Sequence, residues 1–209
     1  MAVTVDELTV ADAPEAWRAC GFEAAGEECV VGGVRIRFSP QEGARGLVGW
    51  SLRGCASLDL DGLPTGSSEQ PAPAEAPEHP NGIAAIDHVV AISPDLDRTV
   101  AALTAAGLDL RRVREEPTPA GAPRQAFFRL GPTILEVVQE PSEATERHGG
   151  DRPAFFWGLA FVAPDLDRTV ELLGEDRVGE IRDAVQPGRR IATLRRAAGL
   201  SLPIALMTP

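Results

Sequence analysis

Two polar side chains stand inside otherwise apolar, strand-like runs of this chain. His88 falls in the run from 83 to 92, and Glu136 falls in the run from 133 to 139. A carboxylate on an apolar strand face must be paired, protonated, metal-bound or exposed. Glu136 is therefore either half of a salt bridge with an arginine such as Arg124 or a general base with a raised pKa. For His88 the alternatives are a structural hydrogen bond and a role in a binding cleft.

Five further side chains are candidates for ligand binding. Arg124 and Gln125 start a predicted strand, where an arginine either holds a ligand carboxylate or phosphate through two hydrogen bonds or forms a structural ion pair. Trp157 follows two phenylalanines, so it either stacks on a flat ligand or joins the core. Gln186 and Arg190 belong to a polar loop leading into a strand, and they line a cleft or lie on the surface.

The remaining histidines and the cysteines carry weaker signals. His79 and His148 stand in polar segments, and we expect both to be solvated. Cys20, Cys29 and Cys55 are odd in number, widely spaced and without a CxxC pairing, so they predict buried free thiols rather than a zinc site.

The elements that position the candidate side chains occur twice. The phrase Pro-Asp-Leu-Asp-Arg-Thr-Val occupies 94–100 and again 164–170, an offset of 164 minus 94, or 70. Each copy follows an apolar run and opens a segment with apolar residues at i, i+4 and i+7, which predicts a strand and then a helix. Ser93 is the expected N-cap of the first helix, and Gly107 closes it.

Each copy continues into further strands and so predicts a βαβββ module. The strands expected beyond the helices lie at 110–113, 124–130, 133–139 and, in the second copy, in two runs ending at 204–207. The first module spans 83–142 and the second 143–209. The offset sets His88 against Gly158, and pairing the terminal strands sets Glu136 against Ala205, so the second copy has no polar side chain at either position.

Two more segments precede the modules. Residues 1–66 predict a short strand, a helix from Pro14 to Gly21, a hairpin turning at Gly32-Gly33 and a strand over 47–52. Residues 67–82 are mainly Pro, Ala, Ser and Glu, a composition that predicts a linker.

Composition excludes several classes of function. The net charge is −11, which disfavours nucleic-acid binding, and all twenty basic residues are arginine, which excludes a Schiff base, a lysine base and a lysine-bearing phosphate loop. GxSxG and HExxH motifs are absent. The N-terminus lacks the basic and apolar regions of a signal peptide, and no run has the length of a membrane span. We expect a cytoplasmic protein with no membrane partner.

The chain resembles the vicinal oxygen chelate superfamily, which includes glyoxalase I, bleomycin-binding proteins and extradiol dioxygenases. The resemblance rests on Ile86-Asp-His88-Val-Val before the repeated phrase, on Phe127-Phe-Arg-Leu-Gly131 leading to Ile134-Leu-Glu136-Val-Val138, and on the tandem copy. It implies an α+β fold in which two modules form a curved mixed sheet around a cleft. The first segment resembles a shortened module.

The resemblance also implies metal ligands on the first and last strands of each module. These positions are His88 and Glu136 in the first module, a donor pair suited to Fe, Mn, Ni or Zn, with Glu136 serving as ligand or base. Gly158 and Ala205 offer no donor, so the ligand set is incomplete. A partner chain in a homodimer, a bound substrate or another residue would have to complete it.

Three functions stay open at this point. The first is a metal-dependent isomerase, lyase or dioxygenase acting on adjacent oxygens of a small molecule. The second is a metal-free protein that binds or sequesters a small molecule, as bleomycin-binding proteins do. The third is an interaction module with a degenerate cleft, so the sequence leaves open whether the protein is an enzyme.

Overall fold

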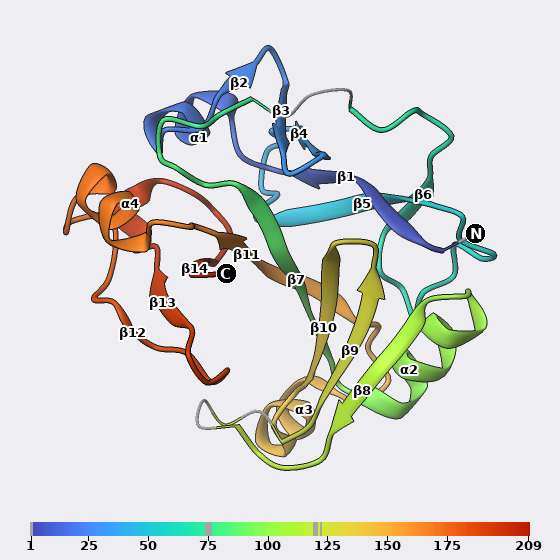
Figure 1. Ribbon diagram of the computed structural model, residues 1–209. Coiled ribbons are helices and arrows are strands. Elements are labelled where there is room, and N and C mark those ends of the chain that lie inside the picture. The colour runs from blue at the N-terminus through green and yellow to red at the C-terminus, as the bar shows by residue number, and fades with distance from the viewer. Residues whose placement is uncertain (1, 74–76, 119–120, 122) are drawn as a thin grey trace.

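The computed structural model describes residues 2–73, 77–118, 121 and 123–209 (Figure 1). The first part of the chain contains β1 (Thr4–Val10), α1 (Pro14–Ala19), β2 (Ala24–Ala25), β3 (Glu28–Val31), β4 (Val34–Phe38), β5 (Leu47–Arg53) and β6 (Thr65–Ser67). The central part contains β7 (Ala85–Ser93), α2 (Leu96–Ala105), β8 (Asp109–Arg114), β9 (Gln125–Leu130), β10 (Thr133–Gln139) and α3 (Ser142–His148). The last part contains β11 (Phe155–Val162), α4 (Leu166–Leu173), β12 (Arg182–Asp183), β13 (Arg190–Thr193), a 3-10 turn (Arg196–Ala198) and β14 (Ile204–Met207).

The strands form two mixed sheets. Within the described residues, one sheet has the order β2-β3-β4-β1-β5-β6 and the other has the order β12-β13-β14-β11-β7-β10-β9-β8. In the larger sheet β10 runs parallel to β7, and β14 runs parallel to β11, as the first and last strands of a βαβββ module do. The predicted α+β fold built on tandem βαβββ modules is confirmed.

The two modules join along an antiparallel seam between β7 and β11, within one chain. Val89 pairs with Leu159 at the centre, and the flanking pairs are His88 with Ala160 and Val90 with Gly158. The offset of 70 makes Gly158 the equivalent of His88 and Ala160 the equivalent of Val90. Each of the two flanking pairs therefore joins the equivalents of the residues in the other pair. The seam is therefore symmetric in the register that the repeated phrase predicts.

Each seam strand carries one bulged residue, Asp87 on β7 and Trp157 on β11, which has no partner across the seam. A bulge inserts an extra residue and changes the phase of the alternation. Alternation alone predicts Ile86 on the face of His88, and this is wrong, because Ile86 is buried in the core on the other face. Asp87 and His88 are consequently brought together by a hydrogen bond.

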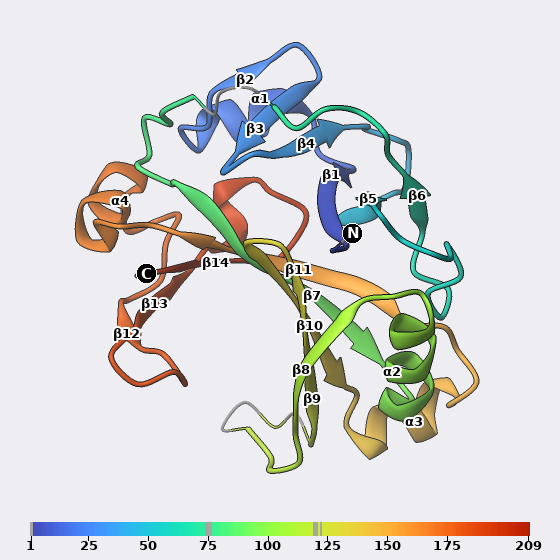
Figure 2. The ribbon, with the colours of Figure 1, turned by 45° about the vertical axis from the view of Figure 1, so that its right-hand side comes forward.

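The core lies between the two sheets. The larger sheet is an arch, and the smaller sheet covers its convex side (Figure 2). Trp17 on α1 contacts Phe161 on β11 edge-on with ring centroids 6.1 Å apart, and Trp50 on β5 contacts Phe156 with centroids 5.1 Å apart. Both tryptophans are fully buried, so the smaller sheet supports the back of the arch and leaves its concave side open.

Several local predictions need correction. Asp95, not Ser93, caps α2 by accepting a hydrogen bond from the Arg98 amide, while Ser93 accepts one from the Asp95 amide. The polar segment around His148 forms a helix over 142–148, which periodicity does not reveal because the segment has good helix formers but no apolar face. Each of these misses concerns a segment boundary or a polar surface element.

His79 is buried rather than solvated. One ring nitrogen, Nδ1, accepts a hydrogen bond from the Glu23 amide, and Nε2 lies 3.1 Å from the Val30 carbonyl oxygen. Burial lowers the pKa of His79, so this histidine is a structural one. His148 is exposed, as expected.

The described part of the predicted linker packs on the smaller sheet. Arg53 donates to the Gln70 carbonyl and Arg35 donates to the Pro71 carbonyl, while Ser68 donates to Asp6. Residues 74–76 of the linker, and 119, 120 and 122 of the loop before β9, lie outside the described residues. No helix in the described part of the chain is long and apolar enough to span a membrane.

Candidate functional site

Two adjoining hollows open on the concave side of the arch. Their volumes are about 460 and 500 Å³, and they meet at a shared floor. The residues that line both hollows are His88, Thr118, Gln125, Glu136, Val185 and Ile191. Strands from both modules contribute to this floor, so the hollows together form one cleft, here called the concave cleft.

The polar centre of the concave cleft is a chain of contacts through His88. Nδ1 of His88 lies 2.7 Å from Asp87 Oδ2, and Nε2 lies 3.4 Å from Glu136 Oε2. Arg189 donates to the other Asp87 oxygen at 2.6 Å, and Gln125 donates to Oε1 of Glu136. Each ring nitrogen of the histidine thus faces a carboxyl group, and each carboxyl group has a second partner.

The two carboxyl groups differ in their electrostatic setting. Burial raises the pKa of Glu136, and this outweighs the opposing effects of His88 and Gln125. Burial also opposes ionisation of Asp87, but hydrogen bonds from His88 and Arg189 lower the pKa of Asp87 to about 2. Asp87 is therefore a fixed anion that orients the imidazole, whereas Glu136 is the carboxyl group whose neutral form burial favours.

Strand pairing explains why His88 and Glu136 meet. β7 and β10 are parallel neighbours, with His88 opposite Ile134 and Val90 opposite Glu136. Residues two apart on a strand share a face, so the two polar side chains lie diagonally across adjacent strands. The sequence separates them by 48 positions, from 88 to 136, and the crossover through α2 brings them together.

The second module supplies a mainly apolar wall. β14 pairs with β11 so that Ala205 lies opposite Ala160, which places Ala205 at the position of Glu136. Gly158 takes the position of His88, and a Cβ atom added there would lie 2.5 Å from the Pro203 carbonyl oxygen. The backbone therefore leaves no room for a side chain at 158, and the second module offers no donor at either equivalent position.

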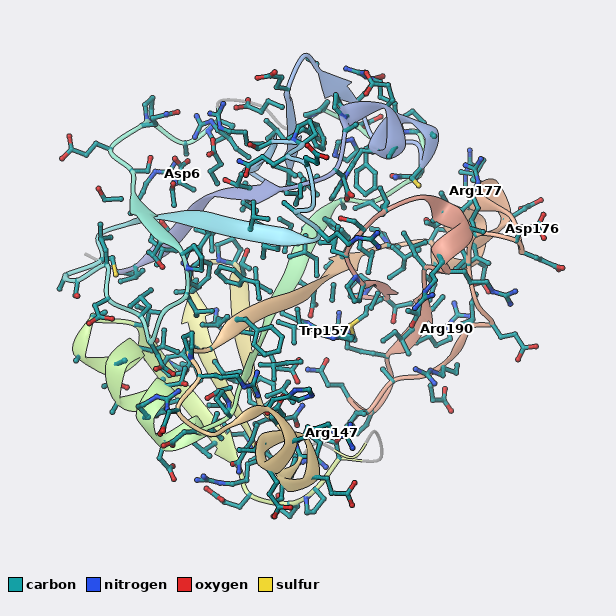
Figure 3. All side chains as sticks on the ribbon, turned by 180° about the vertical axis from the view of Figure 1, so that it is seen from behind. Asp6, Arg147, Trp157, Asp176, Arg177 and Arg190 are labelled. Carbon is teal, nitrogen blue, oxygen red and sulfur yellow. The ribbon has the colours of Figure 1, made fainter. Side chains whose placement is uncertain are left out.

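Three of the five predicted ligand-binding residues line the concave cleft. Trp157 lines the first hollow and is 48% exposed, so it is not part of the core. Gln125 lines both hollows, and Gln186 lines the second, where it accepts a hydrogen bond from Arg189. Figure 3 shows Trp157 on the larger sheet and Asp6 on the smaller one.

The other two, Arg124 and Arg190, lie outside both hollows in equivalent ion pairs. Arg124 contacts Asp97 at 3.0 Å, and also Glu115, whereas Arg190 contacts Asp167. Positions 97 and 167 are the same residue of the repeated phrase, 70 apart. These arginines join each helix start to the strand region of its own module. For Arg124 this is the structural ion pair that the sequence leaves open, and for Arg190 it is the surface position.

Sequence reasoning missed Asp87 and Arg189. Alternation assigns Asp87 to the face opposite His88, and only the bulge brings the two together. Arg189 stands next to the predicted Arg190 but approaches Asp87 from 102 positions away. The sequence signal for this contact is that an acidic residue, Asp87, directly precedes His88.

The donor set does not complete a metal site. His88 and Glu136 supply two donors, and Gly158 and Ala205 supply none. In the part of the chain that the structure describes, no group of three or more His, Cys, Asp or Glu side chains is placed to hold a metal ion. Both nitrogens of His88 already face carboxyl groups, and metal sites in proteins usually need three or four protein ligands.

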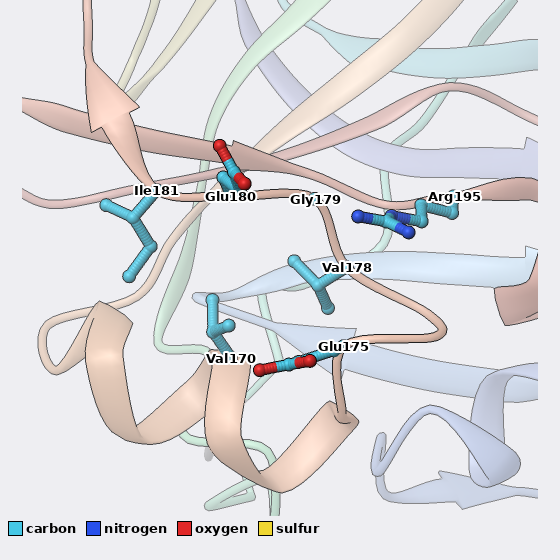
Figure 4. A pocket seen from close by; sticks show the side chains of 7 residues that line it. All are labelled: Val170, Glu175, Val178, Gly179, Glu180, Ile181 and Arg195. Carbon is cyan, nitrogen blue, oxygen red and sulfur yellow. The ribbon is translucent and has the colours of Figure 1, made fainter.

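A third hollow, of about 370 Å³, lies between α4 and the segment 178–181 (Figure 4). Its lining is largely aliphatic, with Val170, Val178 and Ile181 beside Glu175 and Arg195. The histidine and the carboxyl group with the raised pKa lie in the concave cleft instead, so the chemistry is concentrated there.

The fold places this chain in a class of proteins in which paired βαβββ modules form a sheet around a cleft. The sequence model of the Glyoxalase/Bleomycin resistance protein/Dioxygenase superfamily matches residues 85–198. The chain belongs to this superfamily, as its resemblance to the vicinal oxygen chelate proteins predicts. A comparison with curated proteins finds no match.

Several solved structures are similar to this chain. A methylmalonyl-CoA epimerase from Mycobacterium tuberculosis is 19% identical, with a TM-score of 0.50 over 61% of this chain and 89% of that one. One from Streptomyces coelicolor, in complex with 2-nitronate-propionyl-CoA, is 22% identical, with a TM-score of 0.48 over 60% and 97%. A hypothetical protein from Bacillus halodurans is 15% identical, with a TM-score of 0.47 over 59% and 93%. The first of these similarities shows a common fold and nothing beyond it.

Proposed function

We propose that this protein binds a small organic molecule in the concave cleft without a resident metal ion. The observation that carries the proposal is the asymmetry of the cleft. The first module contributes a polar centre at His88, Gln125 and Glu136, and the second contributes a mainly apolar wall that includes Trp157 and Ile191. A ligand with a polar group beside an apolar body fits this arrangement, since specificity in such sites comes from a few placed polar groups in an apolar lining.

The size of the cleft supports the proposal. Hollows of about 460 and 500 Å³ lie within the range of small-molecule sites. Trp157 is 48% exposed although it is a large aromatic residue, and stacking against a ligand would cover it. The polar centre lies at the junction of the hollows, so one ligand can contact both.

A second candidate function is metal-free proton transfer to or from the bound molecule. It is favoured by the raised pKa of Glu136 together with the fixed orientation of His88. With the proton of Nδ1 donated to Asp87, Nε2 is an acceptor beside Glu136, and the pair can share or pass on one proton. An isomerisation is one reaction of this kind, in which a base removes a proton from the bound molecule and returns it to another position.

A thermal-shift screen of a metabolite and drug library, run with EDTA, tests binding. A ligand should raise the Tm of the protein in EDTA, because binding to the native state stabilises it. Trp157→Ala should lower the affinity for that ligand by about 10-fold or more, because losing one aromatic contact costs about 1.4 kcal/mol. Leu172→Ala is the matched control, since Leu172 is 55% exposed on α4 and away from the cleft.

Metal binding would contradict the metal-free proposal. The protein is incubated with Fe(II), Mn(II), Ni(II) and Zn(II), dialysed, and analysed for bound metal. About one metal ion per chain, lost in both His88→Ala and Glu136→Ala, would show that a third ligand completes the site.

A further inference from the structure

Three arginines lie at the mouth of the concave cleft. Arg112 and Arg114 on β8 line the second hollow, and Arg182 on β12 lines the first. Among the described residues, none of these three guanidinium groups makes a hydrogen bond or an ion pair. Other arginines near the cleft are engaged: Arg189 binds Asp87, and Arg190 binds Asp167.

Strand geometry directs two of these arginines into the cleft. A bulge at Arg111 shifts the register of β8, after which Arg112 pairs with Phe127 and Arg114 with Gln125. Phe127 and Gln125 both line the second hollow, and directly paired residues share a face of the sheet. The neighbouring Arg111 does not line either hollow, and it forms an exposed pair with Asp109.

The two edge strands of the arch thus present cations toward the same opening. β8 and β12 are the outermost strands of the larger sheet, and the arch brings them to opposite sides of the cleft (Figure 2). Other arginines of the described chain, among them Arg45 and Arg195, likewise form no ion pair. What sets Arg112, Arg114 and Arg182 apart is that all three line the concave cleft.

We propose that the second hollow binds the anionic group of an amphipathic organic anion through Arg112 and Arg114, with the apolar body in the first hollow. This rests on the proposed function and names its ligand class. Carboxylate and phosphate share the required chemistry, because the guanidinium fork binds either through paired hydrogen bonds. Arg182 adds positive potential from the opposite edge.

One acidic side chain opposes the anion. Glu116 lines the second hollow beside the arginines, so it lowers the local positive potential. Glu136 lies deeper, and burial favours its neutral form, which reduces repulsion of a bound anion. The balance at the rim is therefore two arginines against one glutamate, and Glu116→Gln should strengthen anion binding by a few fold.

The test compares four ligands that share a ten-carbon chain: decanoate, decyl phosphate, decan-1-ol and decyltrimethylammonium. Binding is measured by calorimetry below the micellar concentrations. At least one anion should bind about 10-fold or more tightly than the alcohol, and the cation should bind most weakly, since one charged hydrogen bond changes affinity by roughly that factor. Preference for decanoate identifies a carboxylate site, and preference for decyl phosphate identifies a phosphate site.

The double variant Arg112→Gln/Arg114→Gln should lose the preference for anions, and Arg111→Gln, the matched control on the same strand, should keep it. Equal affinity for the alcohol and both anions would overturn the anion site and leave the proposed function standing. The anion site would also be overturned if none of the four compounds bound while the library screen yielded a ligand. Failure of both experiments would overturn the proposed function as well.

Discussion

The smaller and larger sheets repeat one plan, and the concave cleft lies on the larger one. In the larger sheet β10, β7, β11 and β14 are neighbours, and in the smaller sheet β4, β1, β5 and β6 pair in the same order and directions. Leu8 pairs with Trp50 as Val89 pairs with Leu159, and Asp6 is bulged as Asp87 is. We infer that residues 4–67 repeat the paired-module plan in shortened form.

The equivalent positions hold different chemistry. Glu7 and Arg37 take the places of His88 and Glu136, and they form an ion pair with two hydrogen bonds, of 2.9 and 2.8 Å. Asp6 binds Arg35 and Arg53 at the place of Asp87.

The surroundings of these positions differ too. The predicted linker packs on the smaller sheet beside them, and residues 54–64 connect β5 to β6 without a counterpart of α4 or β13. The larger sheet therefore differs in its extra strands β12 and β13, and in having a histidine and a carboxyl group where the smaller sheet has the Glu7–Arg37 ion pair.

Breaking the ion-pair cluster of the smaller sheet should have the largest effect. Asp6→Ala leaves Arg35 and Arg53 without their shared carboxylate, which is only 2% exposed. We expect the free energy of unfolding to fall by about 3–5 kcal/mol, the cost of breaking a buried ion pair. Urea unfolding measures it, with Asp109→Ala, from an exposed pair, as control. A loss equal to that of the control would contradict the role of Asp6.

Glycine substitutions at equivalent positions sharpen the comparison. Gly158→Ala places Cβ 2.5 Å from the Pro203 carbonyl oxygen, whereas Gly49→Ala places it 3.4 Å from that of Pro64. Overpacking against the backbone should cost about 2–3 kcal/mol at 158 and about 1 kcal/mol or less at 49. Thermal or urea unfolding of the two variants decides it, and equal losses would refute the steric account.

The pH dependence of stability should reveal the partly buried Asp87. Its pKa falls from 3.8 to about 2 in the folded protein, so its contribution of about 2 kcal/mol is fully present above pH 3.8. The contribution is lost as the pH falls through about 2. Unfolding in urea between pH 5 and pH 2 should show a steeper loss in the wild type than in Asp87→Asn. Parallel curves would contradict the assignment.

The smallest effect should come from Glu136. Because burial raises its pKa, the folded state holds this proton to a higher pH than the unfolded state does. Stability should therefore decline as the pH rises from the usual pKa of 4.5 through the raised value, and Glu136→Gln should remove that decline. A decline retained in Glu136→Gln would assign it to another group.

The sequence predicts the parts of this molecule that follow local rules. The repeated phrase gives the offset that sets Gly158 at the position of His88, and pairing the terminal strands sets Ala205 at the position of Glu136. Periodicity finds the strands of the larger sheet except the two-residue β12.

What the sequence does not show depends on contacts between distant segments. The bulge at Asp87 changes which side chains face the cleft, and neither alternation nor composition reveals it. The ion pairs of Arg124 and Arg190 join residues that are 27 and 23 positions apart. The sequence alone therefore does not distinguish a ligand-binding role from a structural one. His79 is buried because its ring contacts the Glu23 amide and the Val30 carbonyl oxygen. The polar residues around it in the sequence do not predict these contacts.

The contact between Gly158 and Pro203 also restricts how this site can change. A new side chain at 158 requires the carbonyl of Pro203 to move, and that carbonyl accepts the Leu159 amide at 3.0 Å. Ala205 already carries a side chain that lines the first hollow. A descendant or a designed variant that gains a metal would therefore acquire its third ligand at 205 before 158, and the order of substitutions is constrained by one backbone oxygen.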